Sequence, residues 1–247
     1  MDPKLTKRIM SDISQLNDSN LRLEGIYWSI NNDNIRELKI MIIGPNGAPY
    51  EGGFFFFNLE IPLDYPFNPP IMKFMTTHNN MRFNPNLYVH GKVCLSILNT
   101  WTGPSWTPCY TILSVLISLV GMVFIADPLR NEPSKERESQ EIVDEYSKIV
   151  EHETLDGAFL KVLEEGAFSE KAQTKTSLEG NNEFFKIFRE DIISYFEKNI
   201  DRYNERMQKL MNEKNVVLTC CYRCNIQTKY DQLYQKFKKI EEYYLKK

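Results

Sequence analysis

A cysteine in the middle of a short apolar run is the first residue of this sequence that could do chemistry. It is Cys94, in the stretch RFNPNLYVHGKVCLSIL, which covers residues 82–98. A thiolate attacks carbonyl carbon, and such cysteines usually need a neighbouring base or a lowered pKa. Free cysteine is also among the most buried residue types. Taken alone, Cys94 is therefore better interpreted as a buried, inert thiol than as a nucleophile.

Two polar residues upstream of Cys94 offer different kinds of help. His90 is the nearest base, and a Cys–His dyad would indicate a cysteine hydrolase. Because no third orienting group and no protease signature accompanies it, we interpret His90 as an exposed loop residue. Asn86 cannot act as a base, but its carboxamide has two N–H donors that could stabilise an oxyanion. Residue types alone favour a simpler interpretation, in which Asn84-Pro85-Asn86 is a tight turn.

The composition bounds the class of protein. The chain has 247 residues and a formal charge of -3, so it has room for one or two domains and no general attraction for nucleic acid or anionic membranes. Its five cysteines are an odd number, and no signal peptide precedes them. We expect free thiols, a cytoplasmic or nuclear location, and neither nucleic acid nor membrane as a partner.

A small sheet and a set of helices must position these residues. Residues 5–16 carry apolar side chains on one helical stripe, and residues 21–77 contain four runs rich in β-branched and aromatic residues, separated by turn signals. The pattern predicts an N-terminal helix packed on a four-stranded antiparallel meander. The apolar segment 110–126 is barely long enough for a membrane span and has no basic flank, so we interpret it as a buried core helix.

The second half of the chain predicts further helices and a change of composition. Helical patterns continue to residue 166, and residues 169–182 are almost devoid of large apolar side chains, which is typical of a linker. Apolar residues then recur at helical spacing over 183–212 and 227–246. The fold class is therefore α+β, and the predicted division is a catalytic domain over 1–166 and a helical extension over 167–247.

Four motifs in order resemble the ubiquitin-conjugating enzyme family. They are GPNGAPYEGGFFFF, PLDYPFNPP, FNPN with GKVCLSIL following it, and WTP before the apolar helix. The resemblance covers roughly residues 1–155, and the segment from Thr77 to Pro104 is most similar to the Z type of that family. It implies the UBC fold of the family and its acyltransferase activity.

The resemblance also implies a role for each residue of the central motif. Cys94 corresponds to the cysteine that accepts ubiquitin as a thioester from an activating enzyme, before transfer to a substrate lysine. Asn86 corresponds to the asparagine that stabilises the oxyanion. Most of the family has a histidine at this position, where it shapes the loop. This sequence has Asn84 instead, as the Z type does, and the difference puts the loop geometry in doubt. Since ATP is spent upstream, the resemblance implies no cofactor.

Other positions match the binding surfaces of the family. Phe67 and Pro108 match two loops that bind RING or HECT ligases, and the insertion 99–105 is expected to reshape access to the thioester. Charges on the first helix match the docking site for the activating enzyme, with a solvated face as the equal alternative. The residues carried over for that helix are Lys4, Lys7 and Arg8, and those for a gate beside the incoming lysine are Asp127, Asn131 and Glu132.

Alternatives to an active ubiquitin-conjugating enzyme stay open. The modifier could be a ubiquitin-like protein, since the Z type is known for using two modifiers. The chain could be an inactive binding module, although such family variants lack the cysteine, and a cysteine hydrolase would need His90. The trio Cys220, Cys221 and Cys224 invites a zinc site, but neither a second pair nor a nearby histidine follows. We therefore expect partly buried thiols there and no metal.

Overall fold

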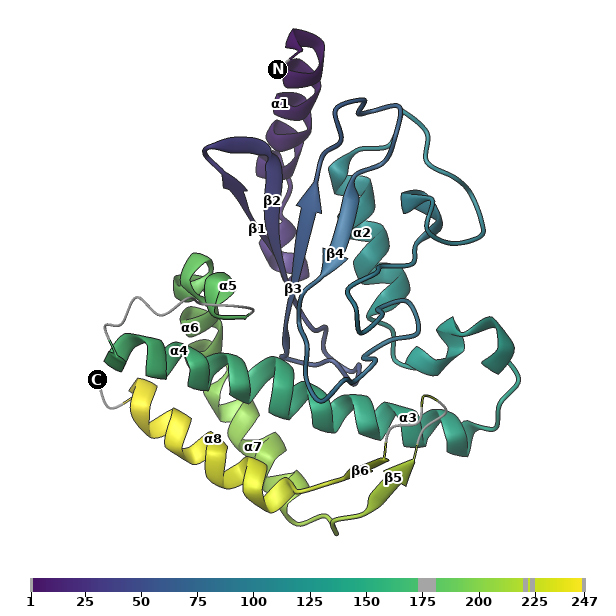
Figure 1. Cartoon of the computed structure of the whole chain (residues 1–247). Helices are drawn as coiled ribbons and strands as arrows, with labels where there is room; N and C mark the ends of the chain where they lie inside the picture. Colours follow the sequence, from purple (N-terminus) through teal and green to yellow (C-terminus); the bar gives the residue numbers. More distant parts are fainter. Residues whose placement is uncertain (1, 173–180, 220–221, 223–224, 246–247) are drawn as a thin grey trace.

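Four strands form one antiparallel sheet in which chain neighbours are also sheet neighbours. The computed structural model describes residues 2–172, 181–219, 222 and 225–245 (Figure 1). The sheet order is β1-β2-β3-β4, so the predicted meander is confirmed. Its strands are β1 (Ile26–Asn31), β2 (Asn34–Ile43), β3 (Phe54–Glu60) and β4 (Ile71–Phe74).

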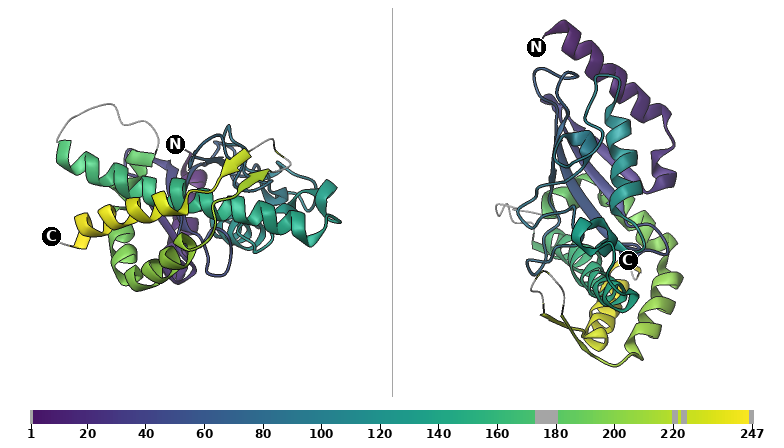
Figure 2. Two further views of the ribbon diagram at one scale, coloured as in Figure 1. Left: turned by 90° about the horizontal axis from the view of Figure 1, so that it is seen from below. Right: turned by 90° about the vertical axis from the view of Figure 1, so that its right-hand side faces the viewer.

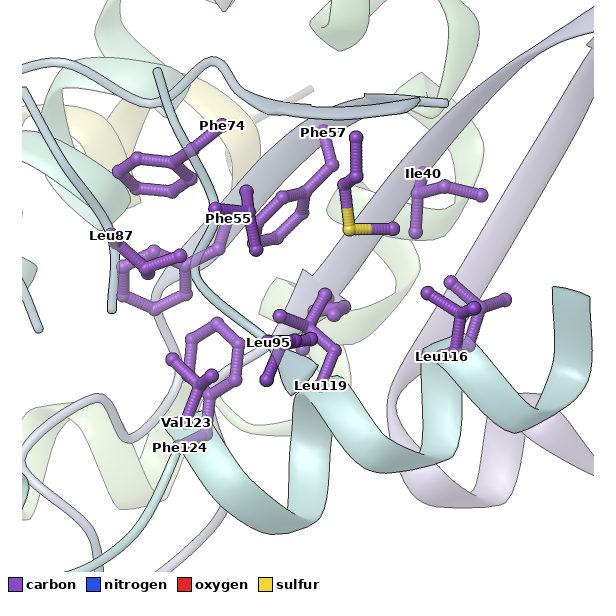
Figure 3. Packing of buried hydrophobic residues seen from close by; sticks show 14 of the residues in the cluster. Ile40, Phe55, Phe57, Phe74, Leu87, Leu95, Leu116, Leu119, Val123 and Phe124 are labelled. Carbon is purple, nitrogen blue, oxygen red and sulfur yellow. The ribbon is translucent and has the colours of Figure 1, made fainter. Parts of the chain in front are cut away.

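One face of the sheet carries the first hydrophobic core. Side chains alternate between the faces of a strand, so Ile40 and Phe57, which pair across β2 and β3, point to the same side. There they meet α2 (Ile112–Val123), the predicted core helix, through Leu116 and Leu119 (Figure 3). The N-terminal helix α1 (Pro3–Asp18) buries its apolar stripe in the same core. No helix in the described part of the chain is long and apolar enough to cross a membrane.

A long helical rod follows the first core. It consists of α3 (Gln140–Glu153), a π-helical segment η5 (Thr154–Leu160) and α4 (Lys161–Ala172), which run on without a break (Figure 1). The predicted linker is therefore wrong at its start, because residues 169–172 are helical, and at its end, because α5 begins at Asn181. Residues 173–180 lie outside the described part.

The remaining helices pack on the other face of the sheet. Met41, Ile43, Phe54 and Phe56 point to this face and join a second core that the C-terminal helices complete. The ring of Phe56 stacks on Phe184 with centroids 4.9 Å apart. The elements are α5 (Asn181–Ile187), α6 (Arg189–Lys198), α7 (Ile200–Met211), β5 (Val217–Thr219), β6 (Asn225–Gln227) and α8 (Tyr230–Leu245).

These helices lie against the rod and do not extend away from it. In Figures 1 and 2, α8 runs alongside α4, and the β5–β6 hairpin reaches toward α3. The boundary predicted between residues 166 and 167 falls inside α4, and both sides of it contribute to the second core. The division into two units stays a prediction.

Short 3-10 turns complete the chain. Two of them follow α2 and carry the residues expected at the lysine gate. The four turns are η1 (Leu21–Glu24), η2 (Ser96–Leu98), η3 (Pro128–Asn131) and η4 (Pro133–Lys135).

Candidate active site

Core residues on both sides hold Cys94 in place. The cysteine lies on the loop between β4 and α2, and its neighbours Val93 and Leu95 are both buried in the first core. Since successive side chains of an extended segment point to opposite sides, the thiol points away from that core. The backbone N–H of Cys94 donates to the carbonyl of Asn86 at 2.9 Å. The cysteine is 1% exposed, so the surrounding side chains enclose it.

Asn86 lies directly beside Cys94. Its Nδ2 donates to the backbone carbonyl of Cys94 at 2.7 Å, which joins the two ends of the loop. A carboxamide has two N–H donors, so this bond leaves the second available. The structure thus brings together the two residues that the motif pairs. The carboxamide has a loop-forming contact with the backbone of Cys94 and a second N–H that has no hydrogen-bond partner among the described residues.

Asn84 replaces the expected histidine as a buried centre of hydrogen bonds. Its side chain is fully buried, and its Nδ2 donates to the hydroxyl of Tyr50 at 2.9 Å and to the carbonyl of Val123 at 2.8 Å. Its Oδ1 accepts from the backbone N–H of Asn86 at 2.7 Å. The loop is therefore tied to the β2–β3 connection and to α2 without a histidine, which answers the doubt that the substitution raised.

The surroundings of Cys94 change the pKa of its thiol in both directions. Burial raises the pKa of the Cys94 thiol above its ordinary value, and the carboxylate of Glu132 adds to that rise. The charges of Lys92 and Arg82 and a hydrogen bond with the hydroxyl of Tyr88 lower the pKa of the thiol. Burial outweighs these groups, so at neutral pH the resting thiol is mostly protonated.

Removing a single charge near the thiol should change its reactivity in a predictable direction. Lys92→Met raises the pKa of Cys94 and should slow its alkylation at neutral pH about two- to fivefold, while Glu132→Gln should accelerate it by a similar factor. Iodoacetamide labelling, followed by mass spectrometry of the Cys94 peptide, measures both rates. Lys7→Met on α1 is the matched control and should change nothing. Equal rates in all variants would contradict the electrostatic assignment.

The three gate candidates differ in what their side chains do. Asn131 is engaged in the scaffold, because its Nδ2 donates to the carbonyl of Met122 at 2.8 Å. Asp127 precedes η3 and is half-buried. Glu132 is the only one of the three whose charge acts on the thiol of Cys94. The choice of Glu132 among the three candidates for the gate stays a prediction.

His90 is exposed, as the sequence predicts. Its ring lies 5.4 Å from that of Tyr88, on the solvent side of the loop. The groups that act on the thiol are Lys92, Arg82, Tyr88 and Glu132. The described structure therefore contains no Cys–His dyad.

The two loops expected to bind a ligase lie together. Trp106 Nε1 donates to the carbonyl of Pro66 at 2.7 Å, which joins the segment of Phe67 to that of Pro108. Phe67 is 77% exposed, and Pro108 is also exposed. Together these segments present an exposed apolar surface.

The basic residues of α1 separate into two groups. Lys4 and Lys7 are exposed. Arg8 instead pairs with Asp12 at 2.9 Å and donates to the carbonyl of Pro108 at 2.9 Å. It therefore ties α1 to the Pro108 loop and is less available to a partner.

Some residues of the site escaped prediction from the sequence. Arg82, Tyr88 and Tyr222 all take part in the surroundings of the thiol, and none belongs to the motif quoted for the family. For Arg82 and Tyr88 the sequence does hold a signal, because a basic and an aromatic residue flank the FNPN motif. For Tyr222 the sequence holds none. Cys220, Cys221 and Cys224 lie outside the described residues, and the described ones contain no cluster that could hold a metal.

A thiol and a carboxamide donor on one loop of an α+β domain are the arrangement of a cysteine acyltransferase. A family model described as "Ubiquitin-conjugating enzyme" matches residues 8–154. The chain belongs to the ubiquitin-conjugating enzyme family.

One of the curated relatives is of the Z type. "Ubiquitin-conjugating enzyme E2 Z" of Xenopus tropicalis is 48% identical over 130 residues, which are 52% of this chain and 41% of that protein. "Probable ubiquitin-conjugating enzyme protein 17" of Caenorhabditis elegans is 40% identical over 173 residues, 64% of this chain and 23% of that protein. A solved Toxoplasma gondii ubiquitin conjugating enzyme E2 domain has a TM-score of 0.46 and 29% identity, over 62% of this chain and 98% of that one. The chain spans less than half the length of these curated relatives.

Proposed function

We propose that this chain is an active ubiquitin-conjugating enzyme that carries ubiquitin on Cys94 and passes it to lysine. The observation that carries the proposal is the 2.7 Å bond from Asn86 Nδ2 to the carbonyl of Cys94, which holds this carboxamide against the backbone of the cysteine in a chain of this family. The same cysteine is free and not engaged in a disulfide. The catalytic unit would be residues 1–166, with residues 167–247 as an extension of it.

The reaction consists of two acyl transfers. In the first, the thiolate of Cys94 attacks the thioester carbonyl held by an activating enzyme, a new C–S bond forms, and the thiolate of that enzyme leaves. In the second, a substrate amine attacks the same carbonyl, the C–S bond to Cys94 breaks, and an amide forms as the amine loses a proton. Neither step consumes ATP at this site. The negative oxygen of the tetrahedral intermediate in the second transfer is what the second N–H of Asn86 would stabilise.

Loading requires the side chains around Cys94 to move. A residue that is 1% exposed cannot meet a second protein, so the segment of Tyr88 must release the thiol first. Tyr88 is half-exposed and lies on a loop without regular structure, which makes a local opening inexpensive. The raised pKa of the Cys94 thiol is that of the closed state, in which the thiol is still buried.

The partners follow from the surfaces already described. The activating enzyme would contact α1 through Lys4 and Lys7, and a RING or HECT ligase would contact the exposed segment of Phe67 and Pro108. Because the chemistry needs a reduced thiol at Cys94, the protein would work in a reducing compartment such as the cytoplasm or nucleus.

The decisive experiment is a loading assay. The protein is mixed with an activating enzyme, ATP and ubiquitin, and the products are separated on gels with and without thiol reductant. We expect an adduct that reductant removes and that Cys94→Ala abolishes. Cys94→Ser should give an adduct that resists reductant, because an ester replaces the thioester. Cys109→Ala, which removes an exposed cysteine, should load normally.

The same assay decides between the alternatives. If a ubiquitin-like modifier loads and ubiquitin does not, the chain is a conjugating enzyme for that modifier, and the thioester mechanism is the same. If no modifier loads from any of several activating enzymes, the chain is a binding module of the same fold. His90→Ala should load like the unaltered protein, and a loss of loading in that variant would revive the hydrolase hypothesis.

A further inference from the structure

The C-terminal hairpin reaches the candidate active site. Strands β5 and β6 pair antiparallel, and Leu218 on β5 is buried in the first core, not in the second core of the C-terminal helices. The backbone N–H of Thr219 donates to Glu145 on α3 at 3.1 Å, which fixes the hairpin on the rod. Tyr222 lies between the two strands and packs against the same core. The hairpin is thus built into the catalytic half of the fold.

Tyr222 contacts Glu132, one of the three candidates for the gate. Its hydroxyl donates to Glu132 Oε2 at 2.8 Å, across 90 positions of sequence. Its ring lies 5.7 Å from that of Tyr146, a residue of α3 that is 1% exposed. The buried ring of Tyr146 thus sets the position of the phenol. A carboxylate has two oxygens, so Oε1 of Glu132 stays available to a further donor.

The ring of Tyr222 also supports the residues that line the thiol. The guanidinium of Arg82 lies 4.5 Å from the ring of Tyr222 and 3.9 Å from the ring of Tyr88, so it is held between two aromatic faces. Its Nη2 donates to the carbonyl of Pro85, while its Nε is buried and has no hydrogen-bond partner among the described residues, so stacking adds to the contacts that hold this side chain. The hydroxyl of Tyr88 in turn lowers the pKa of the Cys94 thiol. The positions of Glu132 and of Arg82 therefore both depend on Tyr222, a side chain of the extension.

We propose that Tyr222 is a positioning residue for transfer to lysine, which holds the carboxylate of Glu132 so that its free oxygen meets the attacking amine. Lysine is mostly protonated near neutral pH and must lose a proton as it attacks the thioester. A carboxylate at a fixed position accepts a hydrogen bond from the ammonium, orients it and removes the proton. This proposal rests on the proposed function, and it makes the extension part of the active site.

Two nucleophiles separate this role from general damage to the site. The full chain is loaded with ubiquitin, the activating enzyme is stopped, and the charged protein is given either free lysine or hydroxylamine. Hydroxylamine is neutral near neutral pH and needs no carboxylate to accept a proton. Tyr222→Phe keeps both ring contacts and removes only the hydroxyl. We expect it to slow transfer to lysine about tenfold and to leave the hydroxylamine reaction unchanged.

Control variants test the route through Glu132. Tyr234→Phe, a matched change on α8, should leave both reactions unchanged. In a Glu132→Ala background the further change Tyr222→Phe should have no effect, because its partner is gone. Thermal unfolding of each variant shows whether the fold is kept.

Three outcomes would overturn the proposal. They are lysine transfer by Tyr222→Phe at the unaltered rate, an equal loss toward both nucleophiles, or additive effects with Glu132→Ala. A failure of the unaltered chain to load ubiquitin at all is a different result, since it overturns the proposed function before Tyr222 is tested.

Discussion

Replacing Asn86 with alanine should slow transfer of ubiquitin from Cys94 to lysine about 100- to 1,000-fold, the loss measured when one oxyanion donor is removed elsewhere. The side chain already donates one N–H to the carbonyl of Cys94 at 2.7 Å, so its position is set before substrate arrives. A donor that is placed in advance stabilises charge as it develops and needs no reorganisation. Loading of Cys94 should be retained, because transfer of an acyl group from one thiolate to another is intrinsically easier than attack on the thioester by an amine.

The change also removes a structural bond, and the experiment has to separate the two roles. Loss of the bond to the Cys94 carbonyl should lower the free energy of unfolding by about 1–3 kcal/mol. Single-turnover discharge to lysine, measured beside the loading rate and chemical denaturation, resolves them. Asn86→Asp keeps the shape without the donors and should transfer as slowly as the alanine variant. Loading and transfer lost in equal measure would assign Asn86 a role in shaping the loop only.

Replacing Phe159 with alanine should lower the free energy of unfolding by about 3–5 kcal/mol, the usual range for deleting a buried phenylalanine. Phe159 is fully buried in η5 and lies 4.2 Å from the parallel ring of Tyr203 on α7. It also faces Phe54 on β3 and Phe237 on α8. Four elements therefore meet at one ring, and no neighbour can fill the cavity without leaving another contact.

Denaturation followed by circular dichroism measures the effect of Phe159→Ala. Phe67→Ala removes the same side chain from a position that is 77% exposed, and it should change stability by less than about 0.5 kcal/mol. A loss below about 1 kcal/mol for Phe159 would mean that the second core is loosely packed and that the C-terminal helices dock weakly. Since the hairpin belongs to the same extension, weaker docking should also slow transfer to lysine in the manner of Tyr222→Phe.

Local patterns made the first half of this fold predictable from sequence. Strands such as Phe54–Glu60 are short, rich in aromatic and β-branched residues and bounded by Gly and Pro, so their type and order follow from nearest neighbours. The apolar segment that became α2 was equally clear. Cys94 and Asn86 were recognised because a motif fixes their spacing, although residue types alone favoured an inert thiol and a turn.

The second half was predicted less well, for an identifiable reason. The periodicity over 183–212 predicted helix but not the breaks at Phe188 and Asn199, where one helix gives way to the next. Those breaks let α6 and α7 turn their apolar faces onto the sheet and the rod. A scarcity of apolar residues suggested a linker from residue 169, yet α4 continues to Ala172. Helix propensity and packing outweigh composition at such an end.

By itself, then, the sequence determined the four strands of the first sheet, the helices packed on their first face and their order, and a motif of the family paired Cys94 with Asn86. All of these depend on residues that are close along the chain. Only the tertiary structure decided how Asn84 replaces a histidine and that Tyr222 meets Glu132 across 90 positions. Contacts between residues so far apart in the chain produce no recognisable period or spacing in a single sequence. The two partners are brought together by hydrophobic cores that other residues form.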